Sequence, residues 1–155
     1  METIKVVLHS DILPPEKMTV GDWIDLRAGE TVIIDEGEQK NISLGISMQL
    51  PEGYEAILAP RSSTFSNWGI IMVGSIGVID NSYCGTNDIW SFPAYCVKGK
   101  EEVLLGTVRR RLSVINKGDR ICQFRIQKVQ PVITFEVVDR LENTDRGGLG
   151  STGVV

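Results

Sequence analysis

Carboxylates and arginines supply the chemistry that this sequence offers. Asp25, Arg61, Asp80 and Arg146 stand in polar, turn-rich segments between apolar stretches. Arginine donates paired hydrogen bonds to phosphate oxygens, and a carboxylate can hold a magnesium-bound water or take a proton from water. His9 is the sole histidine, so multi-histidine metal sites are excluded, and we expect a structural role for it. These residues predict a site for a polyphosphate with magnesium.

The polar side chains fall in five separate segments. They are GDWIDLRA (21–28), APRSSTF (59–65), GVIDNSYCG (77–85), KGDRICQF (117–124) and DRGGLGSTG (145–153). Taken singly, each fits an ordinary turn, helix start or linker. Taken together they read better as an anion site, because hydroxyls add donors and the tail glycines let backbone N–H groups approach a phosphate closely. The P-loop string G-x-x-x-x-G-K-[ST] is not among them.

The elements that must position these segments are β-strands. Apolar residues alternate with polar ones along 42–50, the period of a half-buried strand. Residues 54–59, 89–97, 121–129 and 132–138 also read as strands, and glycine-containing turn signals separate them. A single helical turn is predicted near 63–67, where serine can cap it. Many short strands predict an all-β sandwich or barrel as one domain over 1–142. The glycine-rich residues 143–155 form an arm with no core of their own.

Composition narrows the class further. The net charge is −4, so no basic face for nucleic acid appears at the level of the whole chain. No run of 18 apolar residues predicts a membrane span, and the first apolar run is too short for a signal peptide. The three cysteines are odd in number and lack C-x-x-C spacing, which favours a reducing cytoplasm over a disulfide framework.

In order and wording, the five segments resemble the five motifs of the trimeric deoxyuridine triphosphatase (dUTPase) family, from Gly21 to Gly153. GDWIDLRA and the short tail are most similar to the branch of Gram-positive bacteria and their phages. The resemblance implies a jelly-roll-like β-sandwich. It also implies Mg²⁺-dependent hydrolysis of dUTP to dUMP and pyrophosphate, which limits uracil incorporation into DNA. It further implies a homotrimer with each site between chains, over which the arm of a third chain closes.

The resemblance also implies residue roles. Asp80 is the base that activates water for attack on the α-phosphorus, and the ring of Tyr83 leaves no room for a 2′-hydroxyl. Uracil is read by backbone groups of Gly74, Ser75, Ile76 and Gly77. The phosphate ligands are Arg61, Ser62 and Ser63, with Gln123 at the α-phosphate, Asp25 holding a metal-bound water, and Arg146, Ser151 and Thr152 over the γ-phosphate.

Three departures from the family pattern stand out. The last motif is shorter than usual, and Leu149 replaces the aromatic that stacks on uracil. The segment TNDIWSF (86–92) is unusual, and it places Trp90 and Phe92 on one face of a strand. They are either core residues or substrate-binding residues, one of which takes over the stacking. Residues 98–116 are longer than this connection usually is, and we favour an extended, solvated hairpin there over a partner-binding site.

Two other functions remain as alternatives. Deoxycytidine triphosphate deaminase belongs to the same superfamily, but it needs a glutamate beside the pyrimidine, and none lies between Tyr83 and Glu101. The second alternative is a phage-type regulatory role in which the fold binds a protein partner. Turnover of dUTP by the isolated protein separates catalysis from binding alone.

Overall fold

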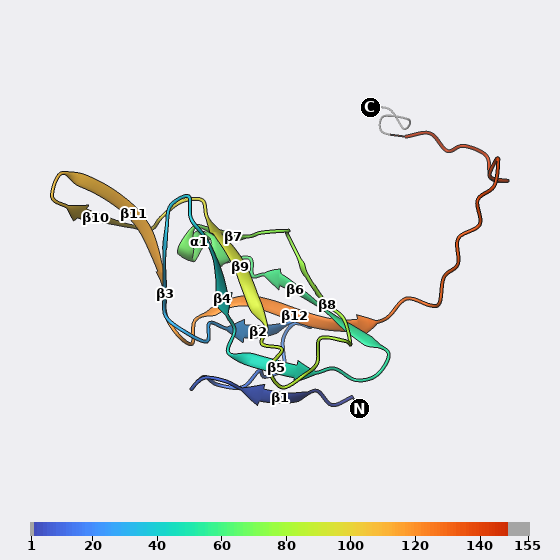
Figure 1. Ribbon diagram of the computed structural model, residues 1–155, viewed down its shortest axis with the longest axis horizontal. Coiled ribbons are helices and arrows are strands. Elements are labelled where there is room, and N and C mark those ends of the chain that lie inside the picture. Colours follow the sequence, from blue (N-terminus) through green and yellow to red (C-terminus); the bar gives the residue numbers. More distant parts are fainter. Residues whose placement is uncertain (1, 149–155) are drawn as a thin grey trace.

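The computed structural model describes residues 2–148, whose regular structure consists of antiparallel β-strands and one short helix (Figure 1). The predicted all-β class is confirmed. The elements are β1 (Lys5–Leu8), β2 (Ile24–Arg27), β3 (Val32–Asp35), β4 (Gln39–Ser43), β5 (Ile46–Gln49), β6 (Tyr54–Pro60), α1 (Thr64–Trp68), β7 (Ile70–Met72), β8 (Gly77–Ile79), β9 (Ser91–Cys96), β10 (Glu101–Leu105), β11 (Val108–Ile115) and β12 (Arg120–Lys128).

The four-stranded sheet β2-β12-β6-β8 carries Asp25, Gly77 and Gln123, and the segments directly after β6 and β8 carry further predicted site residues. Its central strand β12 pairs with β6 over Cys122–Lys128 and with β2 over Arg120–Phe124. These strands confirm the expectations for 54–59 and 121–129. Because β2 and β8 form the two edges of this sheet, the segments that follow or precede them lie at opposite sides of the molecule.

The long apolar alternation over 42–50 is divided between two sheets. β4 pairs with β9, whereas β5 pairs with β1. The break falls at Gly45, which has φ 61, and a Cβ there would lie 2.9 Å from the Cα of Gly29. Only glycine permits this bend and this close backbone approach. The alternation nevertheless continues into the core, so the expectation of one continuous strand is corrected to two.

Large apolar side chains between the sheets form one core. The rings of Trp90 and Phe124 pack edge to face with centroids 5.4 Å apart, and Phe92 lies beside Ile42 across the β4–β9 ladder. Trp90 is 1% exposed and Phe92 0%. Burial of aromatic rings on this scale is a main source of folding free energy.

The short helix α1 confirms the predicted turn after APRSS, but its capping differs. Ser63 stands at the N-cap without a side-chain cap bond. Instead Thr64 accepts a hydrogen bond from the backbone N–H of Arg61 at 2.8 Å and donates to the carbonyl of Ile121 at 2.8 Å. Thr64 is buried. The hydroxyl therefore joins the loop to β12 rather than capping the helix from Ser63.

A hairpin and an extended segment project from this body (Figure 1). The predicted extended hairpin is confirmed as β10–β11, and Arg110 binds both carboxylate oxygens of Asp35 at its base. After β12 the chain leaves the body at Val129, earlier than the boundary at 143 expected for the arm. The predicted strand over 132–138 does not form, because within the described chain these residues have no strand to pair with. No described helix is long and apolar enough to cross a membrane.

Candidate active site in two separate halves

The first half of the candidate site is a group that we call the phosphate cluster: Asp25, Arg61, Arg120 and Gln123. Gln123 lies directly opposite Asp25 on β2 and opposite Ala59 on β6. Residues opposite each other in an antiparallel pair point to the same face, so three neighbouring strands bring these side chains together. The amide of Gln123 donates to the carbonyl of Pro60 at 3.1 Å, which fixes its direction.

Two guanidinium groups share one carboxylate in the phosphate cluster. Nε of Arg61 lies 2.8 Å from Oδ1 of Asp25, and Nη1 of Arg120 lies 3.3 Å from Oδ2. Arg61 also donates to the carbonyl of Arg120 at 3.1 Å. The Asp25 side chain is 22% exposed and that of Arg120 is 45% exposed. Two positive charges from the arginines and one negative charge from Asp25 leave this half with a net positive charge. It therefore favours the binding of an anion.

The loop that follows β6 places the two serines of this half. Ser62 is exposed and Ser63 half-buried, directly after Arg61. Thr64 holds that loop to β12 through its two hydrogen bonds. Sequence reasoning missed Thr64 and Arg120, although both stand inside motifs that it quoted. In the sequence, Thr64 cannot be distinguished from the other residues of its turn-rich segment. Its burial and its two hydrogen bonds become apparent only in the structure.

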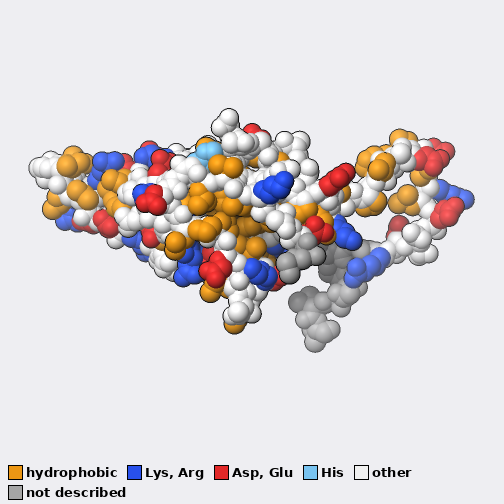
Figure 2. Space-filling model, turned by 90° about the horizontal axis from the view of Figure 1, so that it is seen from below, with side chains coloured by type: hydrophobic (Ala, Val, Ile, Leu, Met, Phe, Trp, Pro, Cys, Tyr) orange, Lys and Arg blue, Asp and Glu red, His pale blue; other side chains and the backbone are white. Residues whose placement is uncertain are grey.

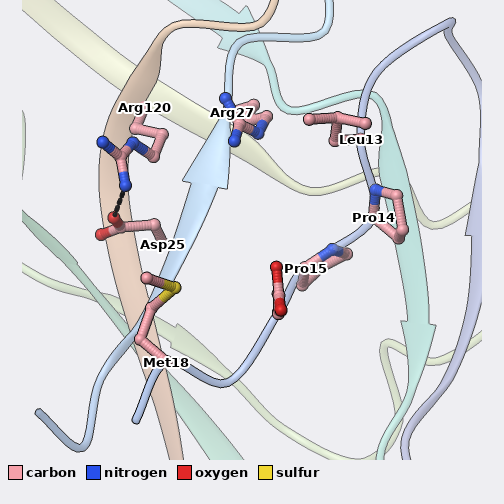
Figure 3. A pocket seen from close by; sticks show the side chains of 8 residues that line it. Leu13, Pro14, Pro15, Met18, Asp25, Arg27 and Arg120 are labelled. Atoms are coloured by element: carbon pink, nitrogen blue, oxygen red, sulfur yellow. Dashed lines mark hydrogen bonds and ion pairs between the residues drawn. The ribbon is translucent and has the colours of Figure 1, made fainter. Parts of the chain in front are cut away.

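A cavity of about 320 Å³ opens beside the phosphate cluster. Figure 3 shows the loop 13–18 facing the two strands that carry Asp25, Arg27 and Arg120, with Arg120 directed at Asp25. Arg27 donates to the carbonyl of Gly118 at 2.8 Å. The apolar wall of this cavity comes from Leu13, the prolines after it and Met18. The cluster therefore lies at the edge of a hollow rather than on a flat surface.

The second half is a cavity of about 440 Å³ between β7, β8 and the start of β9, which we call the nucleoside cavity. The predicted base-reading residues form the turn from β7 to β8. Gly74 has φ 83 and Ser75 φ 70, so both adopt the left-handed conformation. A Cβ at Gly77 would lie 3.1 Å from Leu58 and from Met72. A side chain at 77 would thus press on the wall of this cavity, and close backbone approach is possible only with glycine.

Asp80 and Tyr83 lie at the rim of the nucleoside cavity, and both line it. The Tyr83 hydroxyl donates to the carbonyl of Ile89 at 3.2 Å, and its side chain is 43% exposed. Oδ1 of Asp80 accepts hydrogen bonds from the hydroxyl and from the backbone N–H of Ser82. These bonds, the hydroxyl first, lower the pKa of the Asp80 carboxyl from its usual value. Asp80 is therefore an exposed, ionised carboxylate at neutral pH.

One chain does not bring the two halves together. The phosphate cluster lies on β2, on β12 and directly after β6, whereas Asp80 follows β8, which pairs with the earlier part of β6. Ile79 lies opposite Ala56, and Arg61 is five residues further along, about 17 Å in an extended strand. The cavity beside the cluster and the nucleoside cavity share no lining residue. A nucleoside triphosphate in the second cavity thus needs its phosphate ligands from elsewhere.

Of the two alternatives for Trp90 and Phe92, their burial favours core residues over substrate-binding residues. Phe92 is fully buried between β4 and its neighbours, and Trp90 packs against Phe124 in the core. Trp90 contributes to the wall of the nucleoside cavity, but it is only 1% exposed. Its Nε1 has no hydrogen-bond partner among the described residues. A ring must present its face to stack on a base, and neither residue does so.

The arm contributes Arg146, which is exposed and shares a cavity with other arm residues alone. The other predicted ligands of the arm, Leu149, Ser151 and Thr152, lie outside the described residues. His9 has the structural surroundings expected for it, with Nε2 2.9 Å from the hydroxyl of Ser47. The three cysteines are free, as the sequence predicts.

The described residues fit magnesium only in combination with a substrate. No group of three or more His, Cys, Asp or Glu side chains among them could hold a metal ion. Asp25 is a single carboxylate with both oxygens already next to arginines. Mg²⁺ usually keeps several waters and binds through one or two carboxylates together with substrate phosphates. A carboxylate beside a phosphate-binding cluster suits that mode, and a cage made of protein ligands alone does not form.

A glycine turn over a nucleoside-sized cavity and a separate arginine cluster place the protein among β-folds that handle nucleotides. The family model for dUTPase matches residues 15–153, and the chain belongs to the dUTPase family. It is 54% identical over 137 residues to the SPbeta prophage-derived deoxyuridine 5'-triphosphate nucleotidohydrolase YosS of Bacillus subtilis, covering 88% of this chain and 87% of the relative. A Hydrogenobaculum deoxyuridine 5'-triphosphate nucleotidohydrolase is 36% identical over 81% of this chain and 78% of its own length.

Solved structures share the same fold. The dUTPase of Staphylococcus bacteriophage 80alpha with dUPNHPP aligns with a TM-score of 0.78 at 23% identity, over 99% of this chain and 100% of that chain. The dUTPase of phage phi11 of S. aureus, described with a structural Mg(II) ion, aligns with a TM-score of 0.72 at 23% identity, over 91% of this chain and 99% of that chain. At these identities the similarity is one of fold.

Proposed function

We propose that this protein hydrolyses dUTP to dUMP and pyrophosphate. Family membership supports the activity, and 54% identity to a prophage dUTP nucleotidohydrolase supports the substrate. The observation that carries the proposal is Asp80, an exposed carboxylate at the rim of a cavity of about 440 Å³ whose wall includes Ile76 and Gly77. Such a cavity fits a nucleoside, and the carboxylate stands where its phosphate chain leaves.

Recognition of the deoxynucleoside is assigned to the β7–β8 turn and Tyr83. Backbone groups of Gly74–Gly77 pair with O4 and N3–H of uracil, and cytosine offers the opposite donor pattern at that edge. The Tyr83 ring packs on the deoxyribose, and its hydroxyl bond to Ile89 keeps it in place. A 2′-hydroxyl would collide with the ring, so ribonucleotides are rejected by exclusion.

The chemical step is assigned to Asp80. Its carboxylate takes a proton from a water molecule, and the oxygen of that water bonds to the α-phosphorus while the bond to the bridging oxygen breaks and pyrophosphate leaves. Arg61, Ser62, Ser63 and Gln123 bind the phosphates and orient the chain. A magnesium ion bound with the triphosphate, one of its waters on Asp25, would neutralise phosphate charge.

The two separated halves support a homotrimer in which neighbouring chains complete each site. The exposed apolar surface of the chain also supports a homotrimer. Val132, Phe135 and Val137 on the arm are 100%, 94% and 99% exposed, and Figure 2 shows hydrophobic side chains along the arm and over the middle of one face. Ile133, Phe135 and Val137 alternate with polar residues like a strand that buries one face. Monomers rarely leave such surface uncovered, and the proposed trimer covers it.

A pyrophosphate-release assay with dUTP, dCTP, dTTP and UTP tests the proposal, with magnesium and with a chelator. We expect turnover of dUTP alone, lost on chelation. Ammonia release from dCTP would instead identify the deaminase. Asp80→Asn is the matched control, since it removes the base with little change of shape. No turnover of dUTP by the wild-type protein would contradict the function.

A regulatory role with a protein partner is supported by the hairpin β10–β11. Its tip exposes Leu104 at 64%, Leu105 at 57% and Val108 at 62%, and the hairpin extends well beyond the body (Figure 1). The hairpin is remote from both halves of the site within its own chain (Figure 1). Replacing residues 103–108 by a short glycine turn should therefore leave kcat/KM for dUTP unchanged. A loss of activity would assign the hairpin to catalysis or assembly instead.

A further inference from the structure

The loop between β8 and β9 uses residues other than the predicted ligands to fix the direction of Asp80. Two donors from a single residue, the hydroxyl and the backbone N–H of Ser82, converge on Oδ1. The N–H bond measures 2.7 Å. No donor among the described residues binds Oδ2. Oδ1 of Asp80 therefore accepts two hydrogen bonds, whereas Oδ2 accepts none from the described residues.

The neighbouring Asn81 fixes the loop to the body. Its amide donates to the carbonyl of Pro51 at 2.9 Å and lies 3.5 Å from that of Leu50 and 3.4 Å from that of Tyr54. Those carbonyls belong to the turn between β5 and β6 and to the first residue of β6. The backbone N–H of Tyr83 closes the loop onto the carbonyl of Asp80 at 3.1 Å. The Asp80 backbone thus has little freedom, and Ser82 removes the remaining freedom of the side chain.

We infer that Ser82 is a positioning residue for the reaction proposed above: it occupies Oδ1 of Asp80 and leaves Oδ2 to take the proton from the attacking water. The proton moves from water to Oδ2 as the water oxygen bonds to the α-phosphorus, and the electron pair of the broken P–O bond leaves with pyrophosphate. The inference rests on the proposed dUTP hydrolysis.

The same two bonds keep Asp80 ionised when the site is covered. Asp80 is exposed in the single chain, and exclusion of water by neighbouring chains would raise its pKa. Hydrogen bonds to the charged form oppose that shift, and they already lower the pKa of Asp80, with the Ser82 hydroxyl as the largest cause. The groups that shift this carboxyl come from Ser82 and Tyr83, and no charged side chain of the described residues contributes.

Ser82→Ala, Ser82→Thr and wild type should be compared in single turnover at saturating dUTP from pH 4 to 9. Removing the hydroxyl takes away a donor to the charged form, so the fall in rate on acidification should begin about half to one pH unit higher in Ser82→Ala. The plateau rate should fall about threefold to tenfold because the side chain can rotate. Ser82→Thr retains a hydroxyl and should restore both quantities.

Ser66→Ala is the matched control, since Ser66 is an exposed serine whose hydroxyl donates to the backbone carbonyl of the N-cap residue Ser63. It should leave the pH profile unchanged. Asn81→Asp is a second variant, in which a carboxylate would face three carbonyls, and its plateau rate should fall with little change in KM. An unchanged pH profile and plateau in Ser82→Ala, with wild-type dUTP turnover intact, would overturn the inference. Absence of turnover in the wild type would overturn the proposed function instead.

Discussion

Phe92 provides the sharpest test of whether the uracil is covered by a residue from the core or from the arm. Its side chain is 0% exposed and lies opposite Ile42 in the β4–β9 ladder. Phe92→Ala removes most of a fully buried ring, a change that costs about 3–5 kcal/mol in comparable cores. At about 2–4 °C per kcal/mol for a chain of this size, the melting temperature should fall by roughly 6–20 °C.

The kinetic expectation is the opposite. Stacking of a base on an aromatic ring is worth about 1–3 kcal/mol, so loss of a stacking residue would lower kcat/KM roughly fivefold to a hundredfold. Because Phe92 is enclosed in the core, kcat/KM for dUTP measured well below the melting transition should stay near the wild-type value. Thermal denaturation at one fixed protein concentration, together with steady-state kinetics at low temperature, provides both quantities.

Phe92→Leu and Leu149→Phe complete the comparison. Phe92→Leu keeps an apolar side chain in the core but has no aromatic face, so it should melt only a little earlier and retain normal kinetics. Leu149→Phe restores the aromatic that the family carries in its last motif, and it should raise kcat/KM for dUTP without changing the melting temperature. A tenfold loss of kcat/KM in Phe92→Leu with an unchanged melting temperature would refute the core assignment.

Three further expectations concern the base, the assembly and the thiols. Asp80→Asn should bind dUTP but lose more than nine-tenths of the single-turnover rate, and a variant that kept more would exclude Asp80 as the base. Asp80→Asn chains mixed with chains truncated after Asn143 should regain activity through mixed trimers, whereas sedimentation showing an active monomer would contradict the shared site. Burial raises the pKa of the Cys96 and Cys122 thiols and keeps them protonated. Alkylation of the native protein at pH 8, followed by mass spectrometry, should therefore label the less buried Cys84 first; equally fast labelling of Cys122 would show that the core opens readily.

Much of the fold could be predicted because its information is local. Alternating apolar residues and glycine turns predicted β6 and β12 nearly to the residue. The predicted helical turn and the predicted long hairpin are also present in the structure, because each lies within one short stretch of the sequence. The bend at Gly45 escaped prediction, since the alternation of side chains runs through it unbroken. It depends on the close approach of Gly29, which is distant in the sequence.

The side chains of the phosphate cluster could be predicted in part from the motifs, but their contacts could not. The motifs supplied Asp25, Arg61 and Gln123, and the structure brings them together. Arg120 and Ser82 lie within the same motifs, yet their partners become apparent only when β2 meets β12 and when the loop after β8 turns back on Asp80. The strand expected over 132–138 lacks a partner in its own chain, and no local pattern can show where a partner lies.

The separation of the phosphate cluster from Asp80 within one chain has a genetic consequence. In the proposed trimer each site uses one cluster, one Asp80 and one arm, all from different chains. A defective copy with a single lesion then disables one site per chain, and activity in a cell with both alleles declines in proportion to the share of defective chains. A single chain with lesions in its cluster, its Asp80 and its arm contributes a defective part to each of the three sites, so it disables the whole trimer. Such an allele should be dominant over the wild type, although each lesion alone is not.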